Sequence, residues 1–207
     1  MWLIFLTPIS IITFLFYYAS TGGFGDMPDL EVLENPKTNL ASEIFTSDGK
    51  TLAKYYFNDN RTPVTFDELP THLVDALIAT EDIRFYSHSG IDFKRTFGAA
   101  LKFGKDGGGS TITQQLAKLL FTGEGSKDII ERLTQKFKEY IIAVRLERNY
   151  TKEEIITQYL NLYDFGNNGD GIRSAARIYF GKEPIDLDIN ESAILVGMLK
   201  NSSLYNP

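Results

Sequence analysis

The sequence has no cysteine among its 207 residues. Disulfide bonds, cysteine-ligated zinc and thiol catalysis are therefore excluded, while either side of a membrane remains possible. Histidine is almost as scarce, because His72 and His88 are the only two, and no spacing of His, Asp and Glu predicts a metal-binding cluster. The net charge of −6 leaves no broad cationic surface for nucleic acid. Any anion-binding site must therefore be a local group of cations.

Residues 1–20 contain no charged side chain and are almost wholly apolar. This length is close to the ~20 residues that a helix needs to cross a bilayer, and Trp2, Tyr17 and Tyr18 near its ends are typical of membrane interfaces. The alternatives are a buried core helix and a cleaved signal peptide, which would need the basic start that is missing here. We predict one transmembrane helix at residues 1–20. Its orientation does not follow from flanking charge, because no Lys or Arg precedes it.

The composition changes after this apolar stretch. Residues 21–42 are rich in Gly, Pro and Asn, which predicts a linker. Residues 43–207 are long enough to bury one sizeable core without a disulfide or a metal, and they contain no internal repeat. The sequence stops at Tyr205-Asn206-Pro207 without a recognisable domain tail, so we expect this domain to be incomplete at its C-terminus.

The patterns of residues 43–207 predict a mainly helical domain with one small β-hairpin. Two β-prone runs, 43–45 and 51–57, flank the Asp48-Gly49 pair, which is a common hairpin turn. Apolar residues three or four apart predict helices over 73–86, 111–121 and 129–148, and further helices after Thr151 and after Asp188. Capping boxes predict three of the helix starts: Thr111 with Gln114, Thr151 with Glu154, and Asp188 with Glu191.

The first polar constellation is ATEDIRFYSHSGID, residues 79–92. Glu81 follows an apolar helical face, and Phe85, His88 and Gly90 come after it in a turn-like run. A carboxylate against an aromatic surface gains proton affinity, which suits general acid or base catalysis. Composition alone favours the simpler interpretation of a solvated helix end, with His88 hydrogen-bonded nearby.

The second constellation lies where a glycine-rich run meets a helix, in GGGSTITQQLAKLL. The glycines allow close backbone approach, and the free N–H groups at a helix start suit an anion. Thr111, Gln114, Gln115 and Lys118 follow at i, i+3, i+4 and i+7, so they form one polar stripe opposite the apolar face. Such a stripe suits sugar and phosphate recognition, and a solvated helix face explains it equally well.

The third constellation is Arg132, Lys136 and Glu139, at i, i+4 and i+7 on the predicted 129–148 helix. Lys138 is adjacent in sequence but points elsewhere on a helix. Taken alone, this stripe is typical of an exposed, salt-bridged helix face.

Together and in this order, the segments resemble the family 51 glycosyltransferases, the peptidoglycan polymerases of bacterial cell walls. The family pattern E-D-x-x-F-x-x-H-x-G is matched by Glu81, Asp82, Phe85, His88 and Gly90. The pattern G-G-S-T-I-T-Q-Q-L-x-K is matched without a mismatch by residues 108–118, and R-K-x-x-E is matched in part by Gln135, Lys136 and Glu139. Residues 152–161 and 191–207 are also similar to family blocks.

The resemblance implies a lysozyme-like helical domain, tethered outside the cytoplasmic membrane, that polymerises lipid II. Glu81 would be the general base that deprotonates the acceptor 4-hydroxyl, and Glu139 would be a second carboxylate near the leaving undecaprenyl pyrophosphate. The partners implied are lipid II, the growing glycan strand and the membrane, with no nucleic acid. Many relatives are class A penicillin-binding proteins, so the resemblance also implies the N-terminal part of a bifunctional protein.

The resemblance extends to the substrate-binding residues. Those implied to contact or support substrate are Phe85, His88, Ser110, Thr111, Gln114, Gln115, Lys118, Lys136 and Lys138. No metal-site motif is present, although a divalent cation such as Mg or Mn could assist at the pyrophosphate. An apolar approach surface for the lipid is also expected, for which Phe97, Phe103 and the run 119–121 are candidates, with core packing as the simpler role.

Three positions depart from the family pattern, because Gln135 and Gly98 stand where Arg is common, and Leu119 stands where Asn is frequent. Neither carboxylate is lost, so we predict weakened or redistributed phosphate contacts. Two alternatives remain open, namely a catalytically silent module that binds lipid-linked glycan and a lysozyme-like lytic enzyme.

Overall fold

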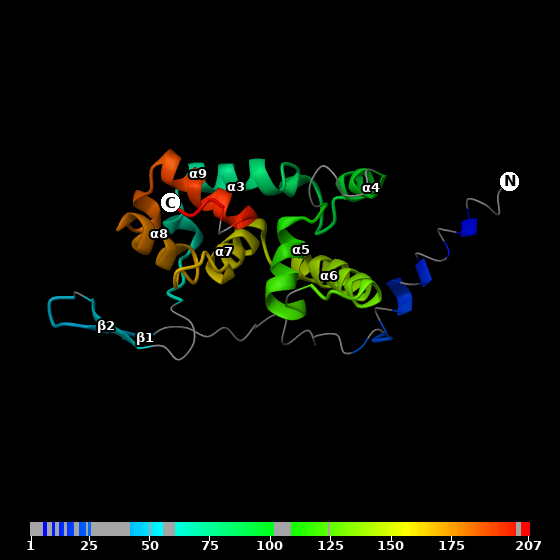
Figure 1. Ribbon diagram of the computed structural model, residues 1–207, viewed down its shortest axis with the longest axis horizontal. Coiled ribbons are helices and arrows are strands. Elements are labelled where there is room, and N and C mark those ends of the chain that lie inside the picture. The colour runs from blue at the N-terminus through cyan, green and yellow to red at the C-terminus, as the bar shows by residue number, and fades with distance from the viewer. Residues whose placement is uncertain are drawn as a thin grey trace. The chain divides into compact units, whose positions relative to one another are not determined.

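The computed structural model describes residues 6–7, 10, 13–14, 16–18, 21–23, 25, 42–49, 51–55, 61–101, 109–123, 125–201 and 204–207. In this part of the chain the fold is mainly helical with one two-stranded sheet, so the predicted mainly helical class is confirmed (Figure 1). Most of the predicted transmembrane helix and most of the predicted linker lie outside the described residues. Among the helices that are described, none is long and apolar enough to cross a membrane.

The described residues divide into two compact units, each built from two separate stretches of the chain. The α5/α6 unit takes residues 1–36 and 88–150, and the α3/α9 unit takes residues 37–87 and 151–207. Both lie mostly within the predicted 43–207 domain. Its predicted boundaries at residues 20 and 42 stay predictions.

The α3/α9 unit contains the sheet and four α-helices. Its elements are β1 (Ser42–Phe45), β2 (Thr51–Tyr55), the 3-10 helix η1 (Phe66–Glu68), α3 (Thr71–Glu81), the 3-10 helix η2 (Phe85–Ser87), α7 (Lys152–Leu162), α8 (Ile172–Phe180), the 3-10 helix η4 (Pro184–Asp186) and α9 (Ile189–Lys200). Strands β1 and β2 pair antiparallel, with Glu43 opposite Lys54. Gly49 in the connection has φ of +78°, a conformation that glycine adopts without strain.

The core of this unit forms where α3 runs along α9 (Figure 1). On α3, Leu73 and Leu77 are fully buried, and on α9 Leu195 and Met198 are equally inaccessible. The α3 helix ends at Glu81, five residues before the predicted end, because Asp82 leaves the helical region with φ of −157°. Aspartate favours such helix-terminating conformations, since its side chain competes with the helical backbone hydrogen bonds.

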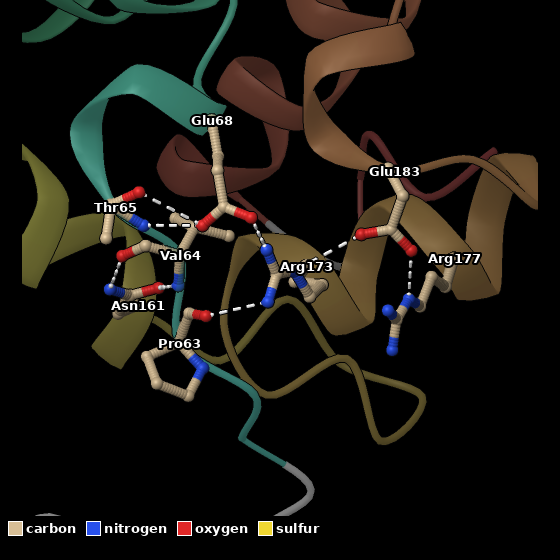
Figure 2. Close-up of polar contacts among 8 residues, drawn as sticks. All are labelled: Pro63, Val64, Thr65, Glu68, Asn161, Arg173, Arg177 and Glu183. Carbon is tan, nitrogen blue, oxygen red and sulfur yellow. Dashed lines mark hydrogen bonds and ion pairs between the residues drawn. The ribbon is translucent and has the colours of Figure 1, made fainter. Parts of the chain in front are cut away.

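The segment 61–68 carries the chain into α3 and is fastened by side chains of α7 and α8 (Figure 2). The amide of Asn161 accepts from the N–H of Val64 at 2.9 Å and donates to its carbonyl at 2.9 Å. Arg173 donates to the carbonyl of Pro63 at 2.9 Å and pairs with the carboxylate of Glu68. These bonds satisfy an extended backbone that has no sheet partner of its own.

Arg173 also links this segment to the loop that follows α8. Its Nε lies 3.2 Å from the carboxylate of Glu183, which also accepts from Nε of Arg177 at 2.5 Å (Figure 2). The Arg173 side chain is only 14% exposed, whereas that of Arg177 is 33% exposed. The more buried guanidinium therefore connects three stretches of chain: residues 61–65, η1 and the loop before η4.

The α5/α6 unit contains α4 (Phe93–Leu101), α5 (Ile112–Ala117), the π-helical turn η3 (Lys118–Thr122) and α6 (Ile129–Asn149). Helix α5 packs against α6 (Figure 1). The predicted helix over 111–121 is therefore an α-helix that changes to a π-helical turn at Lys118. It ends at Gly123, whose φ is +64°.

All three predicted capping boxes are confirmed, at Thr111, Thr151 and Asp188. Helices α4 and α8 were not predicted. Helix α8 starts at Ile172, and Gly171 before it has no side chain to cap the helix, so the usual start signal is missing. The expectation that Phe97 packs in the core is wrong, because its side chain is 67% exposed on α4. Phe103, the other aromatic candidate for a lipid surface, lies outside the described residues.

Candidate active site

Glu81, the predicted base, is the last residue of α3 and is half-buried. It lies near two phenols, Tyr159 of α7 and Tyr163 directly after this helix. Burial raises the pKa of Tyr159 well above its usual value, and the negative charge of Glu81 raises it further. Burial and then Glu81 raise the pKa of Tyr163 as well. Tyr163 is tied to the end of α9, because its hydroxyl donates to the carbonyl of Leu199 at 2.9 Å.

Phe85 is fully buried in η2, four residues after Glu81. The ammonium of Lys152, the first residue of α7, lies 4.2 Å from the centroid of its ring. This is a cation–π contact. The Tyr86 ring packs on Phe85 edge-on, with centroids 5.4 Å apart. Phe85 thus belongs to the packing that surrounds the end of α3, while His88 begins the chain stretch of the α5/α6 unit.

Glu139, the second predicted carboxylate, is buried in the middle of α6 with 4% exposure. Lys136, one turn earlier, forms an ion pair with its Oε2. The same ammonium donates to Oγ of Ser110 at 3.0 Å, and the Thr122 hydroxyl donates to Oε1 of Glu139 at 3.5 Å. We call Ser110, Lys136 and Glu139 the Glu139 cluster. A buried carboxylate needs such partners, since an unpaired charge in the interior is costly.

The burial of Glu139 differs from the sequence-based interpretation of an exposed, salt-bridged stripe. Of the other two residues of this stripe, Arg132 is exposed, whereas Lys136 forms the ion pair with Glu139. The structure therefore brings together three of the predicted site residues, drawn from the start of α5 and the middle of α6.

Thr111 and Gln114, which were expected to bind substrate, are buried in the structure, with 0% and 1% exposure. Their side chains both donate to the carbonyl oxygen of Gly90, at 2.6 Å from Thr111 and 3.2 Å from Gln114. The predicted polar stripe is thus not one solvent-facing surface. Its later members are more open, because Gln115 is half-buried and Lys118 is exposed.

Lys138 points away from the stripe, as expected from its helical position. Its Nζ would lie 3.2 Å from a Cβ placed on Gly25, so the ammonium sits beside the N-terminal stretch. Gln135, which replaces the arginine common in the family pattern, accepts a hydrogen bond from the N–H of Ser126 at 3.0 Å. Its side chain thereby fastens the loop before α6.

Three residues that interact with predicted site residues were not predicted from the sequence: Thr122 beside Glu139 in the α5/α6 unit, and Lys152 and Tyr159 near Phe85 and Glu81 in the α3/α9 unit. Lys152 and Tyr159 fall within the similar block 152–161, which was the one signal that could have found them. Among the described residues, no group of three or more His, Asp or Glu side chains could hold a metal ion.

Comparison with known proteins identifies a family and several relatives that this chain resembles. A family model described as Transglycosylase matches residues 48–207. Penicillin-binding protein 1A of Escherichia coli strain K12 is 39% identical over 186 residues, covering 87% of this chain and 21% of the relative. Penicillin-binding protein 1F of Bacillus subtilis strain 168 is 42% identical over 173 residues, covering 82% of this chain and 23% of the relative. Penicillin-binding protein 1A of Vibrio cholerae is 37% identical over 208 residues, covering 99% of this chain and 24% of the relative.

The chain spans about a fifth to a quarter of the length of these curated relatives. The family model covers most of the chain and includes every predicted site residue from Glu81 to Glu139. The predicted resemblance is confirmed at this level: the chain belongs to the transglycosylases, the family 51 glycosyltransferases.

Proposed function

We propose that this domain is a peptidoglycan glycosyltransferase of cell wall synthesis. It joins lipid II to a growing glycan strand through a β-1,4 bond, with inversion at the donor anomeric carbon and release of undecaprenyl pyrophosphate. The observation that carries this proposal is the Glu139 cluster, in a chain that matches the transglycosylase family over residues 48–207. A buried carboxylate that orients an ammonium is suited to a leaving group that gains negative charge.

Glu81 acts as the general base. Its half-buried carboxylate ends a helix that is fixed by core packing against α9, so it can reach a substrate hydroxyl while its backbone stays in place. It takes the proton from the acceptor 4-hydroxyl, and that oxygen attacks the donor anomeric carbon as the bond to pyrophosphate breaks. Proton removal by a positioned side chain contributes about 10²- to 10⁴-fold to the rate.

Lys136 stabilises the charge that develops on the departing pyrophosphate, and Glu139 holds the ammonium in place. Ser110 contacts the same ammonium from the start of α5. Gln115 and Lys118 are accessible enough to contribute sugar and phosphate contacts. A divalent cation, Mg or Mn, would be bound by the pyrophosphate oxygens, because the Glu139 carboxylate already pairs with Lys136.

The membrane is the second partner. The first turns of α6 expose Ile129, Ile130 and Leu133, at 76%, 76% and 55%. Further along the same helix, the Phe137 ring packs edge-on against Phe16 of the N-terminal stretch, with centroids 5.4 Å apart. An exposed apolar row beside a chain that begins with an apolar segment is suited to a lipid surface.

This arrangement supports a single-pass anchor at residues 1–20, a linker at 21–42 and a lysozyme-like glycosyltransferase domain over 43–207. The domain lies on the periplasmic or extracellular side of the cytoplasmic membrane, where its lipid-linked substrate is displayed. The relatives are several times longer than this chain, so the whole protein is proposed to be a class A penicillin-binding protein.

The test is polymerisation of labelled lipid II by the full chain in detergent micelles, followed by separation of products by length. We expect polymer from the wild type and a rate at least about 10²-fold lower for Glu81→Gln, as for loss of a general base. Asp75→Asn, an exposed acid of the same helix, is the control and should polymerise normally. Full activity of Glu81→Gln would contradict the assignment of the base.

The other outcomes separate the alternative functions. Release of fragments from preformed peptidoglycan, without polymer, would identify a lytic enzyme. Tight binding of lipid II without polymer or fragments would identify a binding module.

A further inference from the structure

Gly90 lies directly against the backbone of α6. Its φ is +89°, and a Cβ placed on it would lie 2.8 Å from the carbonyl carbon and oxygen of Ala143. Real Cβ atoms do not approach backbone so closely, and the left-handed conformation also favours glycine. Gly90 is therefore pressed directly against the α6 backbone, one turn after Glu139.

The carbonyl of Gly90 is held from the other side by α5. It accepts from Oγ1 of Thr111 at 2.6 Å and from Nε2 of Gln114 at 3.2 Å. The two side chains are also bonded to each other's backbone, because the N–H of Gln114 donates to the Thr111 hydroxyl at 3.2 Å and the N–H of Thr111 donates to the Gln114 amide oxygen at 3.3 Å.

This closed set of bonds limits what the two side chains can do for a substrate. A hydroxyl has a single proton to donate, and that of Thr111 is used on Gly90. Both side chains are buried, at 0% and 1% exposure. Contact with a sugar or phosphate would require them to leave the Gly90 carbonyl unsatisfied in the interior, which is costly.

These contacts of Gly90, with Thr111 and Gln114 on one side and α6 on the other, also fix the separation of α5 and α6 at the Glu139 cluster. Ser110 directly precedes Thr111, and its Oγ lies 3.0 Å from Nζ of Lys136. Glu139 and Lys136 lie one and two turns before Ala143 on α6. A shift of α5 relative to α6 would therefore change the Ser110–Lys136 distance directly.

We propose that Thr111 and Gln114 are positioning residues that act through Gly90 to hold the Glu139 cluster in its geometry. They do not contact substrate. This inference rests on the proposed glycosyltransferase function for its kinetic consequences, but its structural consequence is independent of that function. Misplacing a reacting group by about 1 Å can cost up to about 10²-fold in rate.

The kinetic test compares Thr111→Val and Gln114→Met with the wild type in lipid II polymerisation. We expect kcat to fall at least about tenfold while KM stays within about twofold, because positioning is lost and substrate contacts remain. Thr111→Ser retains the hydroxyl and should recover most of kcat. Thr157→Val, which removes a hydroxyl that donates only to the Glu153 carbonyl on α7, is the matched control.

A double-mutant cycle tests the route of the effect. In a Ser110→Ala background, Thr111→Val should lower kcat by less than about twofold further, since the contact through which it acts is already absent. Fully multiplicative effects, or a raised KM with unchanged kcat, would assign Thr111 to substrate binding and overturn the inference.

A structural readout decides the inference without any activity. Lys136 is hydrogen-bonded and ion-paired in the wild type, so acetylation of its ammonium by a water-soluble reagent, followed by mass spectrometry, should be slow. We expect Thr111→Val and Gln114→Met to raise the labelling rate of Lys136 severalfold, with exposed Lys94 as the internal reference. Unchanged labelling of Lys136 in folded variants would overturn the inference. Absence of polymer from the wild type would instead count against the proposed function.

Discussion

The ammonium of Lys152 lies 4.2 Å from the centroid of the buried Phe85 ring. This contact joins the first turn of α7 to the 3-10 turn that follows α3. Lys152→Met keeps most of the aliphatic stem and removes the charge. We expect the free energy of unfolding to fall by about 0.5–2 kcal/mol, the range for a cation–π contact. Urea denaturation measures it, with Lys152→Arg retaining most of the stability and Lys94→Met, in the other unit, as the neutral control.

The two arginines that share Glu183 offer a matched pair of variants. Arg173→Met removes a side chain that is 14% exposed and leaves the Glu68 carboxylate and the Pro63 carbonyl without that partner. We expect this variant to lower the free energy of unfolding by about 2–3 kcal/mol, less than the 3–5 kcal/mol typical of breaking a fully buried ion pair. Arg177→Met removes a more exposed side chain and should cost less than about 1 kcal/mol. Equal losses in thermal or urea unfolding would show that Arg173 does not fasten the 61–68 segment.

Glu68 predicts a dependence of stability on pH. The N–H of Thr65 is the largest of the influences that lower the pKa of Glu68 below its ordinary value of 4.5, and Arg173 adds to this effect. Because the pKa is lower in the folded state, the stabilisation is fully present above the unfolded pKa and is lost as pH falls through the folded pKa. The stability difference between the wild type and Glu68→Gln should therefore be constant near neutral pH and shrink below about pH 4.5. Urea unfolding at several pH values measures the difference, and a gap that widens in acid would contradict this sign.

Glu139→Gln keeps the shape of the side chain and removes the charge that orients Lys136. We expect polymerisation of lipid II to slow by about 10²- to 10³-fold, the cost of losing one electrostatic stabiliser of the transition state. Glu131→Gln, an exposed acid near the start of the same helix, is the control. A wild-type rate for Glu139→Gln would remove the Glu139 cluster from the proposed mechanism.

Local signals explain what the sequence predicted well. Thr111, Thr151 and Asp188 each form a capping box with a residue three positions later, so the chemistry that starts the helix lies within a single turn. Helix α6 followed its apolar spacing to within one residue of its end, at Asn149. The pattern match also placed Ser110, Lys136 and Glu139 in one site, which the structure brings together.

Long-range contacts explain what the sequence could not predict. Nothing in the helix that carries Thr111 and Gln114 shows that the Gly90 carbonyl, 21 and 24 positions earlier, accepts a hydrogen bond from each of them. The sequence likewise does not show that the Gln135 side chain accepts a hydrogen bond from the N–H of Ser126, nine positions earlier. Core packing was the simpler role expected of Phe97, but no helix was predicted around it, and its side chain is exposed on α4.

The division of the chain has a consequence for the order of synthesis. The α3/α9 unit is discontinuous, since residues 37–87 are made before, and residues 151–207 after, the 88–150 stretch of the α5/α6 unit. Helix α3, which ends at Glu81, buries Leu73 and Leu77 in a unit whose core also includes α9, which ends at Lys200. During translation the partner of α3 is thus more than a hundred residues away, whereas α5 and α6 are neighbours in the chain. The α5/α6 unit, which holds the Glu139 cluster, should therefore fold first, and α3, which ends at the proposed base Glu81, should complete its packing last.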